Sequence, residues 1–165
     1  MTAPGLELRL PPQWEALPNA WEPCGQVLRE AGLAEDDVYA LCMVTQELLE
    51  NAVKYGSFAS EEAAVELSVK PAPDEVTIEV RHPVGVEAEL RKFDQAVQWI
   101  RGFQNPFEAY VERLKLVSRH RYSDGESGLG LTRIAYEGRC LLDFFVDATN
   151  TLAVSAIFSR EQETR

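Results

Sequence analysis

The sequence predicts an α+β fold, a two-layer sandwich in which one mixed, mostly antiparallel sheet of about five strands carries helices on one face and a helical lid insertion. Short segments that alternate apolar and polar residues, typical of half-buried strands, occur near both ends of the chain and in its middle. Two long N-terminal segments repeat apolar residues at three- and four-residue spacing, which indicates amphipathic helices. The later strand segments come in two pairs separated by turn residues, which favours antiparallel hairpins.

The first half of the chain is predicted to hold one strand and two helices. The alternating residues 6–10 form a strand that two prolines end. Residues 14–33 show helical spacing, with two prolines that obscure where the helix begins. A second helix begins at the acidic cluster 35–37, which suits the positive end of a helix dipole, and ends at Gly56. Its apolar stripe consists of Val38, Leu41, Thr45, Leu48, Leu49 and Ala52.

The second half is predicted to hold two hairpins on either side of an insertion. Segments 64–69 and 76–80 are joined by a proline-rich turn, and segments 141–147 and 152–158 by a polar turn. The insertion, about 86–126, contains two segments with helical capping residues, and we interpret it as a lid. We expect 1–165 to form a single domain.

Composition excludes several classes of protein. The 45% of hydrophobic residues, without an apolar run of bilayer length, indicate a soluble globular protein without a membrane partner. The first residues show no secretory signal, so we expect a cytoplasmic protein. Cys24, Cys42 and Cys140 each lie in or beside an apolar segment, and we interpret them as small buried residues rather than as a disulfide or a zinc site.

The net charge of −11, from 16 basic and 27 acidic residues, argues against direct binding of nucleic acid. The charge is uneven, because residues 91–121 hold seven basic and three acidic side chains, an excess of +4 that leaves −15 for the rest. Such a segment fits a local anion or an acidic partner surface. A solvated helix face that happens to be basic explains it equally well.

Glu47 and Asn51 are the first candidate site. Four residues apart on a helix, their side chains lie on one face and can reach one target. An amide oxygen is a suitable ligand for Mg²⁺, and a carboxylate one turn away can position or deprotonate a hydroxyl or a water molecule. The alternative is structural, since such carboxylates often pair with nearby cations, as Glu50 can with Lys54.

The second candidate is the turn Gly128-Leu129-Gly130, which leads into a helix. Glycines let backbone N–H groups approach a phosphate, and the helix dipole favours an anion there, although many such turns are purely structural. A P-loop is excluded because no Gly-Lys-Ser/Thr follows, and a Rossmann turn because no strand immediately precedes it.

These segments resemble a known family. Residues 47–56, Glu-Leu-Leu-Glu-Asn-Ala-Val-Lys-Tyr-Gly, resemble the N-box of the histidine-kinase-like, or Bergerat-fold, ATPases, in the form found in anti-sigma-factor serine kinases. Residues 128–134 resemble their second glycine box, and the order of elements from residue 6 to 158 is similar as well. The resemblance implies an ATP-binding serine/threonine kinase that acts by partner switching in transcription regulation.

The resemblance also implies residue roles and partners. Asn51 would hold Mg²⁺, Glu47 would act as the catalytic base, and Gly128, Gly130 and Leu131 would belong to the lid that closes over the ATP phosphates. The γ-phosphate would pass to a serine or threonine of an antagonist protein, with a sigma factor as the other partner. Members of this family often form homodimers, so a homodimer is one expected oligomeric state.

The first glycine box departs from the family pattern. It should fall at residues 80–86, where His82 replaces the aspartate that receives the adenine amino group, and Gly85 is the one glycine left. Neutral imidazole offers one acceptor nitrogen, and losing a charge-assisted hydrogen bond of about 1.5–3 kcal/mol weakens binding by roughly one to two decades. The sequence therefore supports two hypotheses, a Mg-ATP-dependent kinase and a nucleotide-independent protein-binding module. A two-component histidine kinase core fits less well, because the sequence has no phospho-acceptor helix pair.

Overall fold

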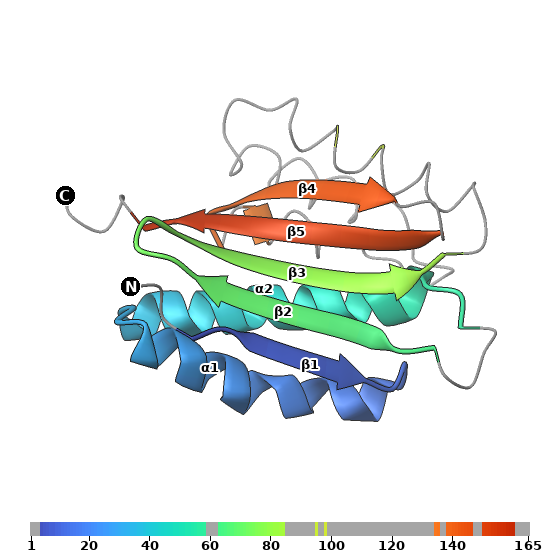
Figure 1. The fold of residues 1–165 in the computed structure, drawn as a ribbon, viewed down its shortest axis with the longest axis horizontal. Helices are drawn as coiled ribbons and strands as arrows, with labels where there is room; N and C mark the ends of the chain where they lie inside the picture. The colour runs from blue at the N-terminus through green and yellow to red at the C-terminus, as the bar shows by residue number, and fades with distance from the viewer. Residues whose placement is uncertain are drawn as a thin grey trace, which may run out of the picture.

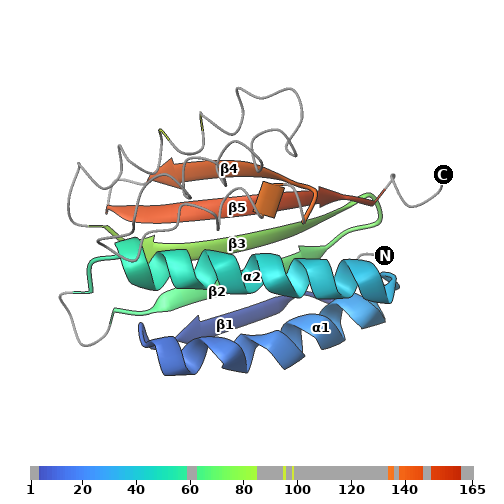
Figure 2. The same ribbon diagram turned by 180° about the vertical axis from the view of Figure 1, so that it is seen from behind.

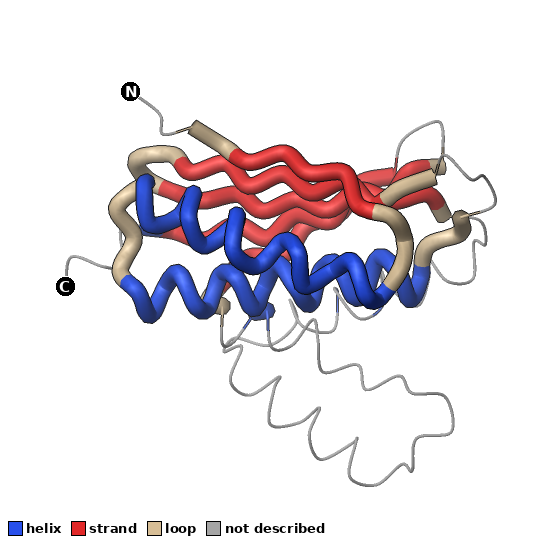
Figure 3. Tube along the Cα trace, turned by 90° about the horizontal axis from the view of Figure 1, so that it is seen from below, coloured by secondary structure: helices blue, strands red, loops and turns tan. Residues whose placement is uncertain are grey.

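The computed structural model describes residues 4–58, 63–84, 95, 98, 134–135, 138–146 and 150–160. These residues form two layers, a sheet and a set of helices that covers one of its faces. Figure 1 views the open face of the sheet, Figure 2 the helical side, and Figure 3 shows the two layers edge-on. The predicted two-layer α+β sandwich is confirmed for this part of the chain.

The described residues form five strands of one sheet, and each neighbouring pair is antiparallel. In chain order the strands are β1 (Leu6–Leu10), β2 (Val65–Pro71), β3 (Glu75–Pro83), β4 (Cys140–Val146) and β5 (Thr151–Ser159). Their order across the sheet is β1-β2-β3-β5-β4, so β1 and β4 are the edges among the described strands. The two predicted hairpins are β2–β3 and β4–β5, which confirms both.

In the N-terminal third of the chain, the helical layer contains a 3₁₀ helix η1 (Trp14–Ala20) and two α-helices, α1 (Trp21–Glu30) and α2 (Glu35–Tyr55). The sequence predicted one continuous helix over residues 14–33, and the division at Trp21 corrects this. Pro18 lies inside η1 and Pro23 in the first turn of α1. A proline has no N–H to donate, so α-helical hydrogen bonding cannot run through Pro18, whereas a proline in the first turn is tolerated.

The core lies between α2 and the inward side of the sheet. All six residues of the predicted α2 stripe are buried, and they face β-strand residues such as Val76, Ile78 and Val80, which alternate with more exposed neighbours. Burying each large aliphatic side chain contributes about 1.5–3 kcal/mol. Cys24, Cys42 and Cys140 are buried and free, which confirms their predicted role. Within the described residues, no helix is long and apolar enough to cross a membrane.

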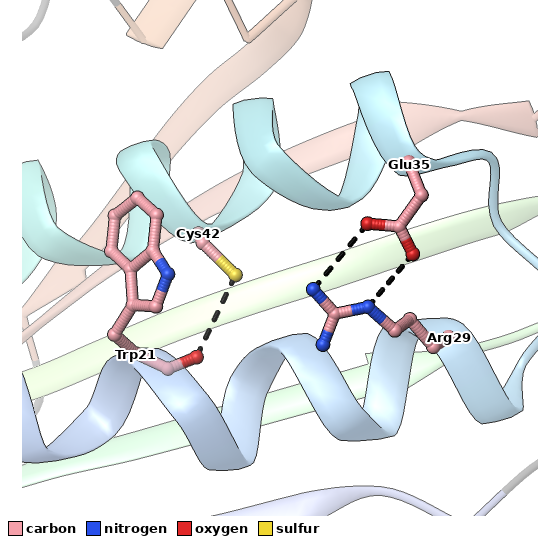
Figure 4. Close-up of polar contacts among 4 residues, drawn as sticks. All are labelled: Trp21, Arg29, Glu35 and Cys42. Atoms are coloured by element: carbon pink, nitrogen blue, oxygen red, sulfur yellow. Dashed lines mark hydrogen bonds and ion pairs between the residues drawn. The ribbon is translucent and has the colours of Figure 1, made fainter.

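Helices α1 and α2 are joined near both ends of α1 (Figure 4). Arg29 donates from Nε to Glu35 at 2.8 Å, and the Cys42 thiol donates to the Trp21 carbonyl oxygen at 3.7 Å. Cys24, between Trp21 and Arg29 on α1, is 3.4 Å from the Thr45 hydroxyl oxygen. These contacts connect α1 and α2, and the buried one between Cys24 and Thr45 lies within the core of the helical hairpin.

Asp37 takes a role that its sequence context did not reveal. It belongs to the acidic cluster at the start of α2, yet it is only 5% exposed and forms an ion pair with Arg139, immediately before β4. The Arg139 guanidinium also lies over the Phe158 ring, 5.4 Å from its centre. The pair therefore ties the start of α2 to the β4–β5 side of the sheet.

Candidate functional site

Three segments that are distant in the sequence meet at one end of the sheet. The Ser57 N–H, just after α2, donates to the Pro83 carbonyl oxygen at the end of β3, at 2.9 Å. The Val84 N–H then donates to the Asn150 carbonyl oxygen, before β5, also at 2.9 Å. Figures 1 and 2 both show the C-terminal end of α2 beside the arrowhead of β3. The fold thus joins the predicted N-box helix to the strand that carries the altered first glycine box.

Glu47 and Asn51 lie one turn apart on α2, and both side chains are half-buried beside the fully buried Leu48 and Ala52. The Asn51 side-chain nitrogen Nδ2 is buried and makes no hydrogen bond within the described part of the chain. Nearly all buried polar atoms in folded proteins have a partner, and leaving one without costs about 1–3 kcal/mol. Nδ2 is a hydrogen-bond donor and cannot coordinate a cation, so it is available to an acceptor such as a phosphate oxygen. The carbonyl oxygen Oδ1 of the same amide is the atom that would hold Mg²⁺ in the role that the resemblance implies.

Gly56 ends α2 as the sequence predicted. Its N–H donates to the Ala52 carbonyl oxygen at 2.8 Å. A Cβ atom at this position would lie 2.5 Å from that oxygen and 2.6 Å from the Phe58 ring. No side chain fits at this position. Because glycine has none, the chain can turn away from the helix and place the Ser57 N–H beside the Pro83 carbonyl oxygen.

His82 lies at the end of β3 on its helix-facing side and is 3% exposed. Its Nδ1 is 3.0 Å from the Pro83 carbonyl oxygen, the same atom that accepts the Ser57 N–H. A carbonyl oxygen only accepts, so Nδ1 carries the hydrogen and Nε2 of the neutral ring is the acceptor. Burial lowers the pKa of His82, and the hydrogen bond to Pro83 opposes this in part. The ring is therefore neutral at pH 7 and offers a single acceptor atom.

The phosphate side of the predicted site lies outside the described residues. This applies to Gly85, Gly128, Gly130 and Leu131, and to nearly all of the insertion. The sequence missed Asn150, whose carbonyl holds Val84 and whose backbone is left-handed, with a φ of 57°. Its one signal was its residue type, since asparagine tolerates this conformation better than most residues.

The described residues define the class of the fold, an open antiparallel sheet with helices on one face. A family model for the histidine kinase-like ATPase domain matches residues 10–135, so the chain belongs to this family. The resemblance seen in the sequence is thereby confirmed at the family level.

Solved structures show the same fold. A chain in the crystal structure of the SiaB–SiaC complex from Pseudomonas aeruginosa is similar, with a TM-score of 0.66 and 15% sequence identity over 93% of this chain and 89% of that chain. At this identity the similarity concerns the fold alone. No curated protein sequence matches the chain.

Proposed function

We propose that the protein binds Mg-ATP and transfers the γ-phosphoryl group to a serine or threonine of an antagonist protein in a partner-switching system. The observation that carries this proposal is the buried Asn51 nitrogen Nδ2, a donor without a hydrogen-bond partner among the described residues, one turn after Glu47 on α2. Family membership supports nucleotide binding. The similar chain comes from a complex of two proteins, which supports an antagonist protein as the partner here.

Each residue of the described half has a distinct role in this proposal. The Asn51 amide oxygen Oδ1 is the Mg²⁺ ligand, and its half-buried side chain extends from a rigid helix. When bound, the metal supplies charge neutralisation at the phosphate oxygens. Glu47 orients the acceptor hydroxyl and takes its proton. His82 accepts a hydrogen bond from the exocyclic amino group of adenine at Nε2.

Calorimetry with Mg-ATP tests the binding step, and a phosphotransfer assay on the antagonist protein tests the chemistry. Glu47→Gln is expected to keep nucleotide binding and lose transfer by a factor of about 10² or more, because the base is removed while the shape is kept. Asn51→Ala is expected to lose both. No heat and no thermal stabilisation at millimolar Mg-ATP would exclude the proposal.

A second function, a nucleotide-independent module that binds an antagonist protein or a sigma factor, is favoured by His82 alone. A neutral imidazole with one acceptor replaces a carboxylate that has two acceptor oxygens. If the protein is such a nucleotide-independent module, Glu47→Ala and Asn51→Ala leave partner binding unchanged, and adding Mg-ATP does not alter partner binding. If the kinase is correct, His82→Asp is expected to tighten ATP binding by roughly one to two decades.

A further inference from the structure

The outer surface of the helical layer carries two exposed aromatic side chains in contact. Trp21, at the start of α1, is 36% exposed, and Tyr39, in the first half of α2, is 68% exposed. Their ring centres are 5.6 Å apart and the ring planes meet at 72°, an edge-to-face arrangement. In Figure 4 the Trp21 indole extends from α1 toward α2. Exposed aromatic rings that gather at one place are typical of interaction surfaces.

An edge-to-face pair leaves ring faces open to a ligand. The face of an aromatic ring carries partial negative charge, so it attracts a cation that lies within about 6 Å of the ring centre. Tryptophan is the most effective ring for this contact and tyrosine also makes it, and the cation is more often arginine than lysine. The aromatic pair of Trp21 and Tyr39 is therefore suited to a cationic side chain.

The carboxylates beside the aromatic pair favour the same sign of ligand. Glu22 follows Trp21 on α1, Asp36 lies one turn before Tyr39 on α2, and both are exposed. A helical side chain points back toward the N-terminus of its helix, so Tyr39 extends over the turn that holds Asp36. Neither carboxylate forms an ion pair within the described part of the chain. Both are available to a cation from a partner.

The basic side chain on this surface is already neutralised. Arg29 is the only basic residue between positions 14 and 53, and it donates to both carboxylate oxygens of Glu35, at 2.8 and 3.4 Å. Glu35 is the main cause of the raised pKa of Arg29, and Glu22 contributes to it as well. Glu22 therefore lies close enough to act on the same surface, and Arg29 does not cancel its charge.

The helical layer as a whole is acidic. Residues 14–54 hold eight acidic and two basic side chains, a net charge of −6 out of −11 for the chain. Such a surface repels nucleic acid and anionic lipid headgroups, and it attracts basic protein segments. Charge complementarity therefore selects a basic protein segment as the occupant of the aromatic pair.

We propose that Trp21 and Tyr39 bind an arginine-bearing segment of a partner protein, with one guanidinium against the aromatic pair and Glu22 and Asp36 as the flanking carboxylates. A guanidinium is planar, stacks on aromatic faces and is more weakly hydrated than an ammonium, so arginine is favoured over lysine. Tyr39 lies twelve residues before Asn51 on α2, about 18 Å along the helix axis. The surface is thus separate from the candidate nucleotide site, and its occupant binds without nucleotide.

An NMR titration of the full chain with isotope-labelled tryptophan tests this surface, because each of the three tryptophans gives one indole N–H signal. The probe is a synthetic peptide in which arginine alternates with serine. A matched peptide carries citrulline, a neutral residue of nearly the same shape, in place of arginine. The Trp21 signal, identified by its absence in Trp21→Phe, is expected to shift with the arginine peptide alone. The signal of Trp14, which is 52% exposed on η1, is expected to stay.

Substitutions separate the aromatic contribution from the charge contribution. Tyr39→Leu stays apolar but loses the ring face, so it is expected to weaken binding of the arginine peptide about three- to fivefold, whereas Tyr39→Phe keeps it. Asp36→Asn and Glu22→Gln are each expected to weaken binding about twofold or more. Glu50→Gln is the matched control, because it makes the same charge change about 16 Å further along α2, beyond the screening length of about 8 Å at physiological salt.

The proposal is overturned if the Trp21 signal does not respond to the arginine peptide, if the citrulline peptide shifts it equally, or if Tyr39→Leu binds as tightly as wild type. An effect of Glu50→Gln equal to that of Asp36→Asn would also overturn it, since general acidity would then explain the binding. A Trp21 response to tetramethylammonium ions of the same strength would indicate a small-cation site instead. A shift with protein concentration alone would assign the surface to another copy of the chain, which equally contradicts the proposal. The comparison of the two peptides uses the wild-type chain, so it does not depend on the folding of any variant.

Discussion

His82 donates a hydrogen bond from Nδ1 to the carbonyl oxygen of Pro83, 3.0 Å away, and this fixes which nitrogen of the buried ring remains an acceptor. The same oxygen accepts the Ser57 N–H, so the ring orientation depends on the junction between α2 and β3. Local geometry at this junction thus determines what the replaced aspartate position can offer a ligand.

The stability of the protein is expected to fall as the pH drops below about 6.5, the ordinary pKa of histidine. Burial lowers the pKa of His82 in the folded state, so over this range the unfolded state binds more protons and the free energy of unfolding rises with pH. Urea midpoints measured across this range provide the test. His82→Gln is expected to flatten the dependence, and His120→Gln, at the only other histidine, is the control. An unchanged slope in His82→Gln would contradict the assignment.

Asn51→Ala is expected to leave the stability of the nucleotide-free protein unchanged or raise it by about 1 kcal/mol. The substitution removes a buried amide whose nitrogen has no hydrogen-bond partner and whose burial costs about 1–3 kcal/mol. The thermal stabilisation by Mg-ATP is expected to disappear at the same time. Melting curves with and without nucleotide measure both effects, and Glu50→Ala, an exposed position on the same helix, is the control. A large loss of stability in Asn51→Ala would mean that the amide has a structural role.

Gly56→Ala is expected to destabilise the protein by about 1–3 kcal/mol, because the new Cβ atom overlaps the Ala52 carbonyl oxygen and the Phe58 ring. The backbone φ of −74° is accessible to any residue, so the cost arises from overlap and not from backbone strain. Phe58→Ala in the same chain relieves one of the two overlaps and is expected to recover part of the loss. Chemical denaturation of the wild type and these two variants measures the change in the free energy of unfolding. A Gly56→Ala protein as stable as wild type would show that the junction can shift freely.

Arg160→Ala is expected to destabilise the protein by about 1–3 kcal/mol. Its guanidinium donates to the carbonyl oxygens of Ala72 and Ala31, each at 2.9 Å, and so joins the β2–β3 hairpin to the segment that connects α1 and α2. Arg29→Ala is the matched control, since Arg29 also makes two hydrogen bonds, but to one exposed carboxylate, Glu35. Exposed pairs contribute little, so the control is expected to be close to wild type. Equal effects of the two substitutions would argue against a special role of Arg160.

Much of the fold followed from the sequence because the relevant signals are local. The α2 stripe, the Gly56 stop and the two hairpins depend on helical or alternating periodicity and on turn residues, which act over a few positions. The N-box segment placed Glu47 and Asn51 one turn apart in the same way. The sequence did not predict the division between η1 and α1. Its two prolines left the start of one helix uncertain, whereas in the structure Pro18 lies in a 3₁₀ helix and Pro23 in the α-helix that follows.

Only the tertiary structure shows the contacts between residues that are distant in the sequence. The sequence could name His82 as a departure, but the tautomer follows from Pro83 and Ser57, and the partner-free state of the Asn51 nitrogen follows from what packs around it. Asp37 looked like a helix-capping charge until the fold set Arg139 beside it. Strand register alone brought Leu141, Phe145 and Ile157 onto one face. Periodicity fixes which side of an element is apolar, whereas only three-dimensional packing determines which neighbour, if any, meets that side.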